Sequence, residues 1–376
     1  MQNKGLNQKA VLLELKKILQ KDQQYDDGRI LCSMCTKPNS TARLAYQLFL
    51  NSNLGDPGLF PGSAKLEQEA IADLAAVLNG VGSVGFIVSG GTEANLLAML
   101  AARNRAQVEE PEVILPKSAH FSFEKICGLL KLKPVYAELD SAFKVDASAV
   151  ERLVSKKTVA IVGTAGTSEL GVVDPIEKLS AIAKRHNVCL HVDAAFGGLM
   201  IPFLKDFDSE FDFRLEGVQS ITVDPHKMGM APAPAGGILF RDSKALDYIK
   251  TETPYLTDKF QYTFIGTRTG ASAAATWAVF KNLGREGFQK TVGNCMKTTR
   301  FLHDGIANLG LKLVVEPTLN ILAFRSQNTK LSAEKLRQRG WYVSYVPRLD
   351  CIRIIVMPHV KKTHAEAFLK DLSEVI

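Results

Sequence analysis

The central part of the chain alternates short apolar segments with amphipathic ones. Seven short segments have apolar cores and the length of β-strands: Val84–Val88, Glu112–Leu115, Lys133–Glu138, Thr158–Gly163, Val188–Asp193, Gln219–Val223 and Gly236–Phe240. Helical patterns lie between or before several of these segments: Lys65–Asn79, Gly91–Gln107, Phe121–Leu130, Asp146–Ser155 and Pro175–Asn187. This alternation predicts an α/β domain built on a mostly parallel, seven-stranded sheet.

The pattern changes towards both ends of the chain. The first residues predict an amphipathic helix, whose apolar positions are Val11, Leu12, Leu15, Ile18 and Leu19. After residue 265, a long helical region and a helix near the C-terminus enclose four predicted strands: Leu311–Val315, Asn320–Arg325, Trp341–Val346 and Cys351–Met357. We therefore expect an N-terminal helical arm at 1–55, a large domain at 56–265 and a smaller α+β domain at 266–376.

Charge and hydropathy exclude several classes of protein. The net charge is +7, but Lys and Arg are interleaved with Asp and Glu, and no long basic run indicates nucleic-acid binding. No apolar run is long enough to cross a membrane, and the N-terminus lacks the features of a signal peptide. We expect a cytoplasmic protein, in which a modest positive charge suits anionic substrates and a phosphorylated cofactor.

The six cysteines are scattered through the chain, unlike a secreted disulfide framework. Cys32 and Cys35 form a lone Cys-x-x-Cys pair without a second pair of ligands to complete a zinc site. We expect no metal site and interpret these two cysteines as packing residues.

An acidic residue and a lysine follow two neighbouring predicted strands. Asp193 ends the strand that also carries His191, and Lys227 follows the strand that ends at Val223. A lysine can hold an aldehyde cofactor as a Schiff base, and an acid can keep the ring nitrogen of pyridoxal phosphate protonated. Because lysine attacks an aldehyde only as a neutral amine, we expect nearby cations or burial to lower the pKa of Lys227. We interpret His191 as a structural neighbour that orients Asp193.

A candidate phosphate site follows the strand ending at Val88. Ser89–Asn95 (SGGTEAN) opens a helix, so its free backbone N–H groups, with Gly90, Gly91 and Thr92, can bind an anion. Gly80–Gly85 also matches the dinucleotide pattern G-x-G-x-x-G. This second motif follows a helix and opens a strand, which is the wrong order for nicotinamide binding.

Three further positions suit the same cofactor or its substrate. His120 could lay its imidazole on the cofactor ring, and Thr164 or Thr167 could offer a hydroxyl group. Arg353 lies between apolar residues of a C-terminal strand, where an arginine either pairs within the protein or binds a substrate carboxylate.

These motifs together resemble a known enzyme family. The chain is similar to the group II pyridoxal-phosphate-dependent amino acid decarboxylases of fold type I, and among them to the archaeal L-tyrosine/L-aspartate decarboxylases. The resemblance covers nearly the whole chain and rests on these segments: NLGDPGLFPG (53–62), SGGTEAN (89–95), AHFSFEK (119–125), HVDAA (191–195), DPHKMGMAPAPAGG (224–237), GTR (266–268) and IRIIVMPH (352–359). Some of the fragments are shared with phospho-sphingoid lyases.

The resemblance implies a role for several residues. Lys227 corresponds to the Schiff-base lysine, Asp193 to the partner of the ring nitrogen and His120 to the ring-stacking residue. Gly91, Thr92 and His226 would bind the phosphate. Gly266 and Thr267 would reach the cofactor of a neighbouring subunit in a homodimer. Two departures stand out: Asp224 occupies a position where many animal and plant relatives have asparagine, and the mobile catalytic loop, near Tyr255–Tyr262, has no clear match. Lys227 or Tyr255 is therefore the candidate proton donor.

The same resemblance implies the reaction. A decarboxylase of this kind would convert L-tyrosine to tyramine for methanofuran, or L-aspartate to β-alanine for coenzyme A. The alternatives are a carbon–carbon lyase acting on a phosphorylated amino alcohol, an aminotransferase, and a binding protein that uses the fold without catalysis.

Overall fold

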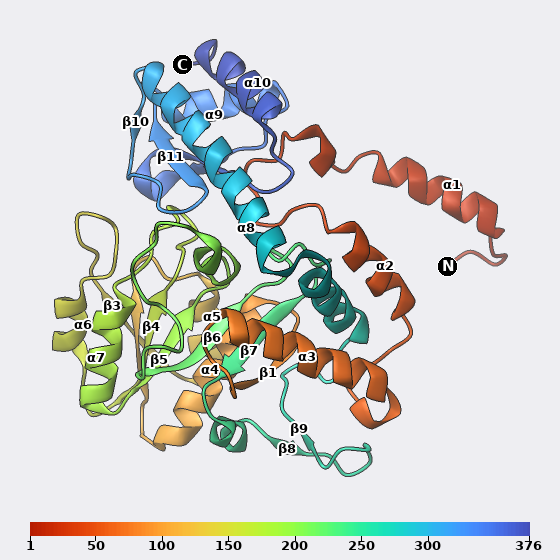
Figure 1. The fold of residues 1–376 in the computed structure, drawn as a ribbon, viewed down its shortest axis with the longest axis vertical. Helices are drawn as coiled ribbons and strands as arrows, with labels where there is room; N and C mark the ends of the chain where they lie inside the picture. Colours follow the sequence, from red (N-terminus) through yellow and green to blue (C-terminus); the bar gives the residue numbers. More distant parts are fainter.

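A computed structural model describes residues 1–376, and a seven-stranded sheet forms its centre (Figure 1). The strand order is β1-β7-β6-β5-β4-β2-β3. Their bounds are β1 Val84–Val88, β2 Glu112–Pro116, β3 Lys133–Ala137, β4 Thr158–Thr164, β5 Cys189–Asp193, β6 Val218–Val223 and β7 Gly236–Phe240. Only β7 is antiparallel to its neighbours, so the other six strands point the same way and end at one edge of the sheet.

Helices cover both faces of this sheet, because successive side chains of a strand point to opposite faces. On β4, Ile161 and Val162 belong to two different apolar clusters. One cluster packs under α4 and α5, and the other under α3, α7 and the first part of α8. The bounds of the large-domain helices are α3 Pro61–Val77, α4 Gly91–Ala106, α5 Ser122–Leu130, α6 Ala147–Leu153 and α7 Ile176–His186. A two-stranded hairpin, β8 Thr251–Glu252 and β9 Phe260–Gln261, extends below the sheet in Figure 1.

The C-terminal part forms a second, smaller layer structure. An antiparallel sheet of order β10-β11-β13-β12 packs against the end of α8 and against α9 and α10. The bounds are α8 Gly270–Asn308, β10 Lys312–Leu313, β11 Ile321–Arg325, α9 Thr329–Gln338, β12 Ser344–Val346, β13 Cys351–Ile355 and α10 Lys362–Ser373. Gly284 interrupts α8 with a φ of 56°, a conformation that glycine adopts without strain. The helix bends there and connects the two domains.

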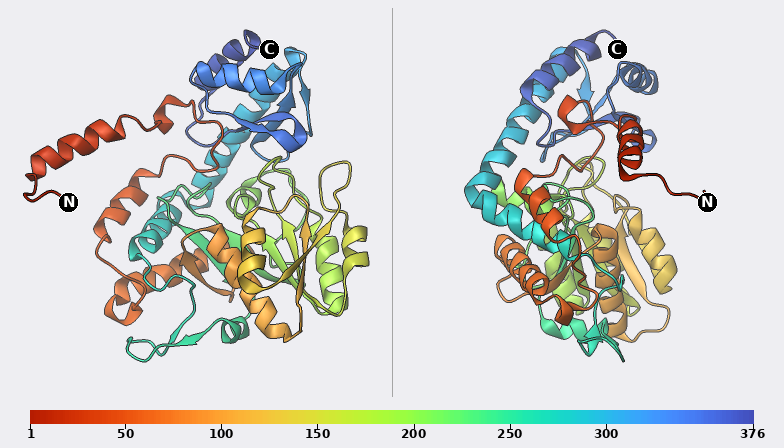
Figure 2. Two further views of the ribbon diagram at one scale, coloured as in Figure 1. Left: turned by 180° about the vertical axis from the view of Figure 1, so that it is seen from behind. Right: turned by 90° about the vertical axis from the view of Figure 1, so that its right-hand side faces the viewer.

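The N-terminal arm contains α1 Gln8–Leu19 and α2 Ser40–Leu48. Asn39 caps α2, and its side chain accepts hydrogen bonds from the backbone of Thr41 and Ala42. In the left view of Figure 2, α1 extends away from the rest of the molecule, and none of its residues is buried. Short 3₁₀ turns complete the chain: Tyr25–Asp27, Pro57–Leu59, Gly197–Leu199, Ile201–Phe203, Ser243–Tyr248 and Pro347–Leu349.

The fold expected from the sequence is confirmed. All seven predicted strands of the large sheet occur within one residue of their expected bounds. Two helices, α2 and α9, had not been predicted, and β10 and β12 are shorter than expected. No helix combines the length and the apolar character needed to cross a membrane.

Candidate active site

A cavity of about 300 Å³ lies at the edge where the parallel strands end. Its walls come from the segments that follow β1, β2, β4, β5 and β6, so residues far apart in sequence meet there. In open α/β sheets, ligands bind at this edge. The cavity brings together Asp193 and Lys227 and most of the other residues singled out from the sequence: Gly90, Gly91, Thr92, His120, Thr164 and His226.

Asp193 is the last residue of β5 and only 6% of its surface is exposed. Its Oδ2 accepts a hydrogen bond of 3.0 Å from Nδ2 of Asn95, and its Oδ1 accepts one of 3.1 Å from the backbone N–H of Ala195. His191 does not contact Asp193 directly; it hydrogen-bonds to Asn95 instead. Asn95 had been read only as part of the SGGTEAN motif, and its link to Asp193 spans 98 positions in sequence.

Lys227 lies in the turn after β6, and its Nζ is 3.1 Å from Oδ2 of Asp224. Burial lowers the pKa of the Lys227 ammonium, but the nearby carboxylates of Asp224 and Asp193 outweigh burial and the pKa is raised. The expectation of a lowered pKa is therefore wrong for the protein without cofactor. It had left out Asp224, which is only 2% exposed and lies beside the lysine.

The first turn of α4 lies at the cavity wall, where its free backbone N–H groups can bind an anion. No side chain caps this helix, because Gly90 occupies the capping position. A Cβ at Gly91 would lie 3.1 Å from Oδ2 of Asp224, and one at Gly90 would lie 3.3 Å from Cε1 of His226. The Nδ1 atom of His226 is 2.6 Å from the carbonyl oxygen and 3.3 Å from the backbone nitrogen of Ala235, which hold the imidazole ring in place.

Unpartnered polar atoms line the same cavity. Six buried side-chain N or O atoms of the protein have no hydrogen-bond partner, and three of them belong to cavity residues: Oγ of Ser118, Oγ1 of Thr164 and Oδ1 of Asp224. Such atoms cost free energy unless a ligand satisfies them. The free N–H groups of α4, a buried carboxylate, a lysine and free hydroxyl groups fit the phosphate, ring nitrogen, aldehyde and ring oxygen of pyridoxal phosphate.

His120 also lines the cavity, and burial lowers the pKa of its imidazole. Its Nδ1 accepts a hydrogen bond of 3.2 Å from the backbone N–H of Ser122. Of the two candidate threonines, only Thr164 lines the cavity. The Oγ1 of Thr167 instead accepts a hydrogen bond of 3.2 Å from the backbone of Val172 and stabilises the loop after β4.

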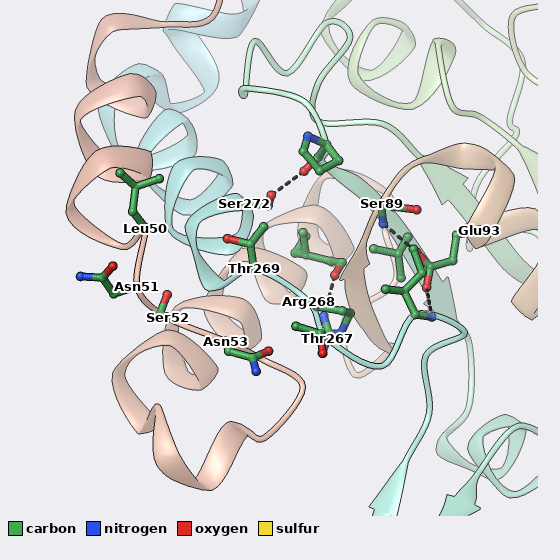
Figure 3. Close-up of a pocket in the computed structure, with 14 residues that line it drawn as sticks. Leu50, Asn51, Ser52, Asn53, Ser89, Glu93, Thr267, Arg268, Thr269 and Ser272 are labelled. Carbon is green, nitrogen blue, oxygen red and sulfur yellow. Dashed lines mark hydrogen bonds between the residues drawn. The ribbon is translucent and has the colours of Figure 1, made fainter. Parts of the chain in front are cut away.

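Thr267 lines an adjoining pocket of about 470 Å³, which shares Ser89 with the first cavity (Figure 3). Leu50–Asn53, which follow α2, form its opposite wall. Gly266 and Thr267 are exposed, and Tyr255 is 86% exposed in the β8–β9 hairpin. None of these three residues lines the cavity that holds Lys227.

Arg353 lies one residue behind the wall of the cavity. Its Nη1 donates to the carbonyl oxygen of Ser168, a cavity residue, and its Nη2 donates to that of Cys32, both at 2.6 Å. Its Nε is buried without a partner, and the guanidinium forms no ion pair. The guanidinium is therefore held at the back of the cavity wall by backbone carbonyl groups, without a carboxylate beside it.

Comparisons with known proteins agree with this arrangement. Residues 60–327 match the family model described as the pyridoxal-dependent decarboxylase conserved domain. A probable L-tyrosine/L-aspartate decarboxylase of Methanothermobacter thermautotrophicus is 52% identical over 93% of this chain and 98% of its own. The L-aspartate decarboxylase of Thermococcus kodakarensis is 48% identical over 99% of this chain and 98% of its own.

Solved structures show the same fold. The sphingosine-1-phosphate lyase of Burkholderia pseudomallei is 30% identical with a TM-score of 0.93, over 100% of this chain and 92% of that one. The glutamate decarboxylase of Lactobacillus brevis superposes with a TM-score of 0.91 at 21% identity, over 100% of this chain and 93% of that one. The family match, the close relatives and the cavity together lead to one conclusion: the chain belongs to the pyridoxal-dependent decarboxylases and is a pyridoxal-phosphate-dependent amino acid decarboxylase.

Proposed function

We propose that the enzyme removes the α-carboxylate of L-tyrosine, L-aspartate or both, giving tyramine or β-alanine. The observation that carries this proposal is the guanidinium of Arg353 behind the cavity wall, which donates to backbone carbonyls but forms no ion pair and has a free Nε. It suits a substrate with a carboxylate besides the one that leaves, as in L-aspartate. The names of the close relatives support both amino acids. Tyramine would be used to make methanofuran, and β-alanine would be used to make coenzyme A.

The proposed roles of the residues follow from their positions in the cavity. When bound, pyridoxal phosphate supplies a ring that accepts the electron pair released as the bond from Cα to the carboxylate breaks. Lys227 would hold the aldehyde carbon of the cofactor, Asp193 would pair with the ring nitrogen, and His120 would pack on the ring. The phosphate is held at the start of α4 and by His226, through these residues: Gly90, Gly91 and Thr92.

Two groups remain candidates for returning a proton to Cα. Lys227 lines the cavity and has Asp224 beside it as a proton acceptor or donor. Tyr255 is exposed in the hairpin, so it would have to move to reach the substrate. The hydroxyl of Thr164 is unpartnered and in the cavity, which favours it over Thr167 as a cofactor contact.

We also propose that the enzyme is a homodimer with shared active sites. The apolar positions of α1 are all exposed, between 41% for Val11 and 58% for Leu19. An isolated helix of 12 residues is only marginally stable in water. We therefore expect the exposed apolar face of α1 to pack against a second subunit. The pocket in Figure 3 lies beside the cavity, and Thr267 in its lining, with the adjacent Gly266, would contact the cofactor of the second subunit.

Six free cysteines are consistent with a reducing compartment, and we propose the cytoplasm.

The substrate is tested by incubating the protein and pyridoxal phosphate with L-tyrosine, L-aspartate, other L-amino acids and a phosphorylated amino alcohol. The proposal predicts carbon dioxide and the matching amine from L-tyrosine or L-aspartate. Aldehyde and phosphoethanolamine from the amino alcohol, without carbon dioxide from any amino acid, would establish the lyase alternative instead. Product formed only with an added keto acid would indicate an aminotransferase.

Assembly is tested by sedimentation of the full chain and of the double variant Leu12→Glu, Leu15→Glu. The wild-type protein should sediment as a dimer. The double variant should form a weaker dimer, with a larger dissociation constant than the wild type. The matched control is Lys9→Glu with Lys16→Glu, which changes charge on α1 without removing apolar side chains. A wild-type monomer would contradict the proposed assembly.

A further inference from the structure

A chain of buried polar side chains runs into the protein from Asp193 and Asn95, which both line the cavity. Asn95 of α4 lies between Asp193 and His191, with its Nδ2 3.0 Å from Oδ2 of Asp193 and its Oδ1 3.0 Å from Nε2 of His191. The Oγ1 of Thr222 is 2.7 Å from the same Oδ1, and the Oγ of Ser220 is 2.8 Å from Nδ1 of His191. All five residues are at least 94% buried.

The chemistry of these groups fixes the direction of every hydrogen bond. The NH₂ group of Asn95 donates to the carboxylate of Asp193, so the amide oxygen of Asn95 faces the other way, towards His191 and Thr222. The Oδ1 of Asn95 then accepts from the hydroxyl of Thr222 and from the Nε2–H of His191. His191 therefore has no proton on Nδ1, which accepts from the hydroxyl of Ser220. Each donor points towards Asp193.

The ionisation of His191 agrees with this assignment. Burial lowers the pKa of its imidazole to about 4, so the ring is neutral at neutral pH. A neutral ring has one N–H and one acceptor nitrogen, which is what Asn95 and Ser220 require. Turning the Asn95 amide over would place its oxygen against the carboxylate and break the pattern at both ends.

We propose that Asn95 is a positioning residue that, with His191 behind it, holds the carboxylate of Asp193 correctly oriented for the ring nitrogen of pyridoxal phosphate. The inference rests on the proposed role of Asp193. The backbone N–H of Ala195 is the only other hydrogen-bond donor to this carboxylate in the protein. Removing Asn95 would leave one oxygen of a buried carboxylate without its donor and free to turn, which weakens its pairing with a ring N–H.

The test compares pyridoxal phosphate with 1-deazapyridoxal phosphate, in which a C–H replaces the ring nitrogen. Dissociation constants are measured by fluorescence for the full-length protein after cofactor removal. Asn95→Ala should weaken binding of pyridoxal phosphate by roughly 10- to 100-fold, the scale of a lost hydrogen bond to a buried charge, and leave binding of the analogue within about twofold. Equal weakening of both ligands, or of neither, would overturn the proposal, because a merely structural role does not distinguish them.

Three further variants keep the test decisive. Asn95→Asp is isosteric and retains the acceptor for His191 and Thr222, so it covers the case in which the alanine variant does not fold; it should show the same selective loss. Thr222→Val removes a hydrogen bond to Asn95 without touching Asp193 and should cause a smaller loss than either. Asp193→Asn tests the role of Asp193 separately from that of Asn95. If Asp193→Asn fails to discriminate between the ligands, the proposed role of Asp193 is wrong; if it discriminates and the Asn95 variants do not, only this inference is wrong.

Discussion

The Nζ atom of Lys227 lies 3.1 Å from Oδ2 of Asp224, three residues earlier in the chain. This contact keeps the lysine protonated in the protein without cofactor, since the carboxylates of Asp224 and Asp193 raise its pKa despite burial. A protonated amine cannot attack an aldehyde. Capture of the cofactor therefore requires that the proton leave Lys227, and Asp224 is the nearest group able to take it.

The first prediction concerns Asp224→Asn. Removing the negative charge should lower the pKa of Lys227, so a larger fraction of the amine is neutral at neutral pH. The rate of covalent cofactor capture, followed by absorbance across a pH series, should then have its midpoint at lower pH than in the wild type. A midpoint that stays in place or moves upward would show that Asp224 does not control the lysine.

The second prediction concerns the first turn of α4. A Cβ at Gly91 would lie 3.1 Å from Oδ2 of Asp224 and 3.3 Å from Cβ of Ala195, so Gly91→Ala must displace one of them. We expect cofactor affinity to fall by about tenfold, corresponding to overpacking by about 1.4 kcal/mol. The control is Gly128→Ala in α5, where the new methyl group would contact nothing within 4 Å. Equal cofactor affinity in the two variants would argue against phosphate binding at Gly91.

The third prediction concerns Arg353. If its guanidinium binds a carboxylate of the substrate side chain, Arg353→Gln should raise KM for L-aspartate by roughly 10- to 100-fold, the scale of a charge-assisted hydrogen bond. KM for L-tyrosine should change much less. The control is Arg348→Gln, because Arg348 already pairs with Glu169. Equal effects on both substrates would assign Arg353 to the α-carboxylate or to a structural role.

The fourth prediction concerns the pH dependence of stability. Burial lowers the pKa of His191 from 6.5 to about 4, so between these values the unfolded chain binds more protons than the folded protein. Stability contributed by this group is present above about pH 6.5 and is lost as the pH falls. At pH 5 the loss is about 2 kcal/mol.

His191→Gln should abolish that loss, so its free energy of unfolding should fall less between pH 7 and pH 5 than that of the wild type. Asp174 acts in the opposite sense, because burial raises its pKa to about 6, but it is present in both proteins and cancels in the difference. The surface variant His186→Gln is the control and should follow the wild type. Parallel pH profiles for His191→Gln and the wild type would show that His191 is not neutral in the folded protein.

Much of the fold could be predicted because buried strands carry their own apolar signal. Most strands of the large sheet contain a short apolar run. Asp193 ends one of these strands, and Lys227 lies in the turn after another. By contrast, α9 was missed because its buried face includes Thr329 and Ser332, which weaken the apolar stripe. Helix α2 was missed because only Ala42 is buried.

The parts of the site that could not be predicted depend on contacts between distant segments. Asn95 meets Asp193 only because α4 crosses the face of the sheet on which β5 displays alternate side chains. The choice between Thr164 and Thr167 depends on the turn after β4, which sends one hydroxyl into the cavity and the other to Val172. The pKa of Lys227 was misjudged because the approach of Asp224 depends on how the turn after β6 folds.

The central claim is that Lys227 holds the aldehyde of pyridoxal phosphate. The most direct measurement is borohydride reduction of the full-length protein with its cofactor, followed by peptide mapping by mass spectrometry. We predict a single pyridoxyl adduct on the peptide containing Lys227, and none in Lys227→Ala, whereas Lys330→Ala should label like the wild type. An adduct on a different lysine, or no adduct in the active wild-type enzyme, would contradict the account.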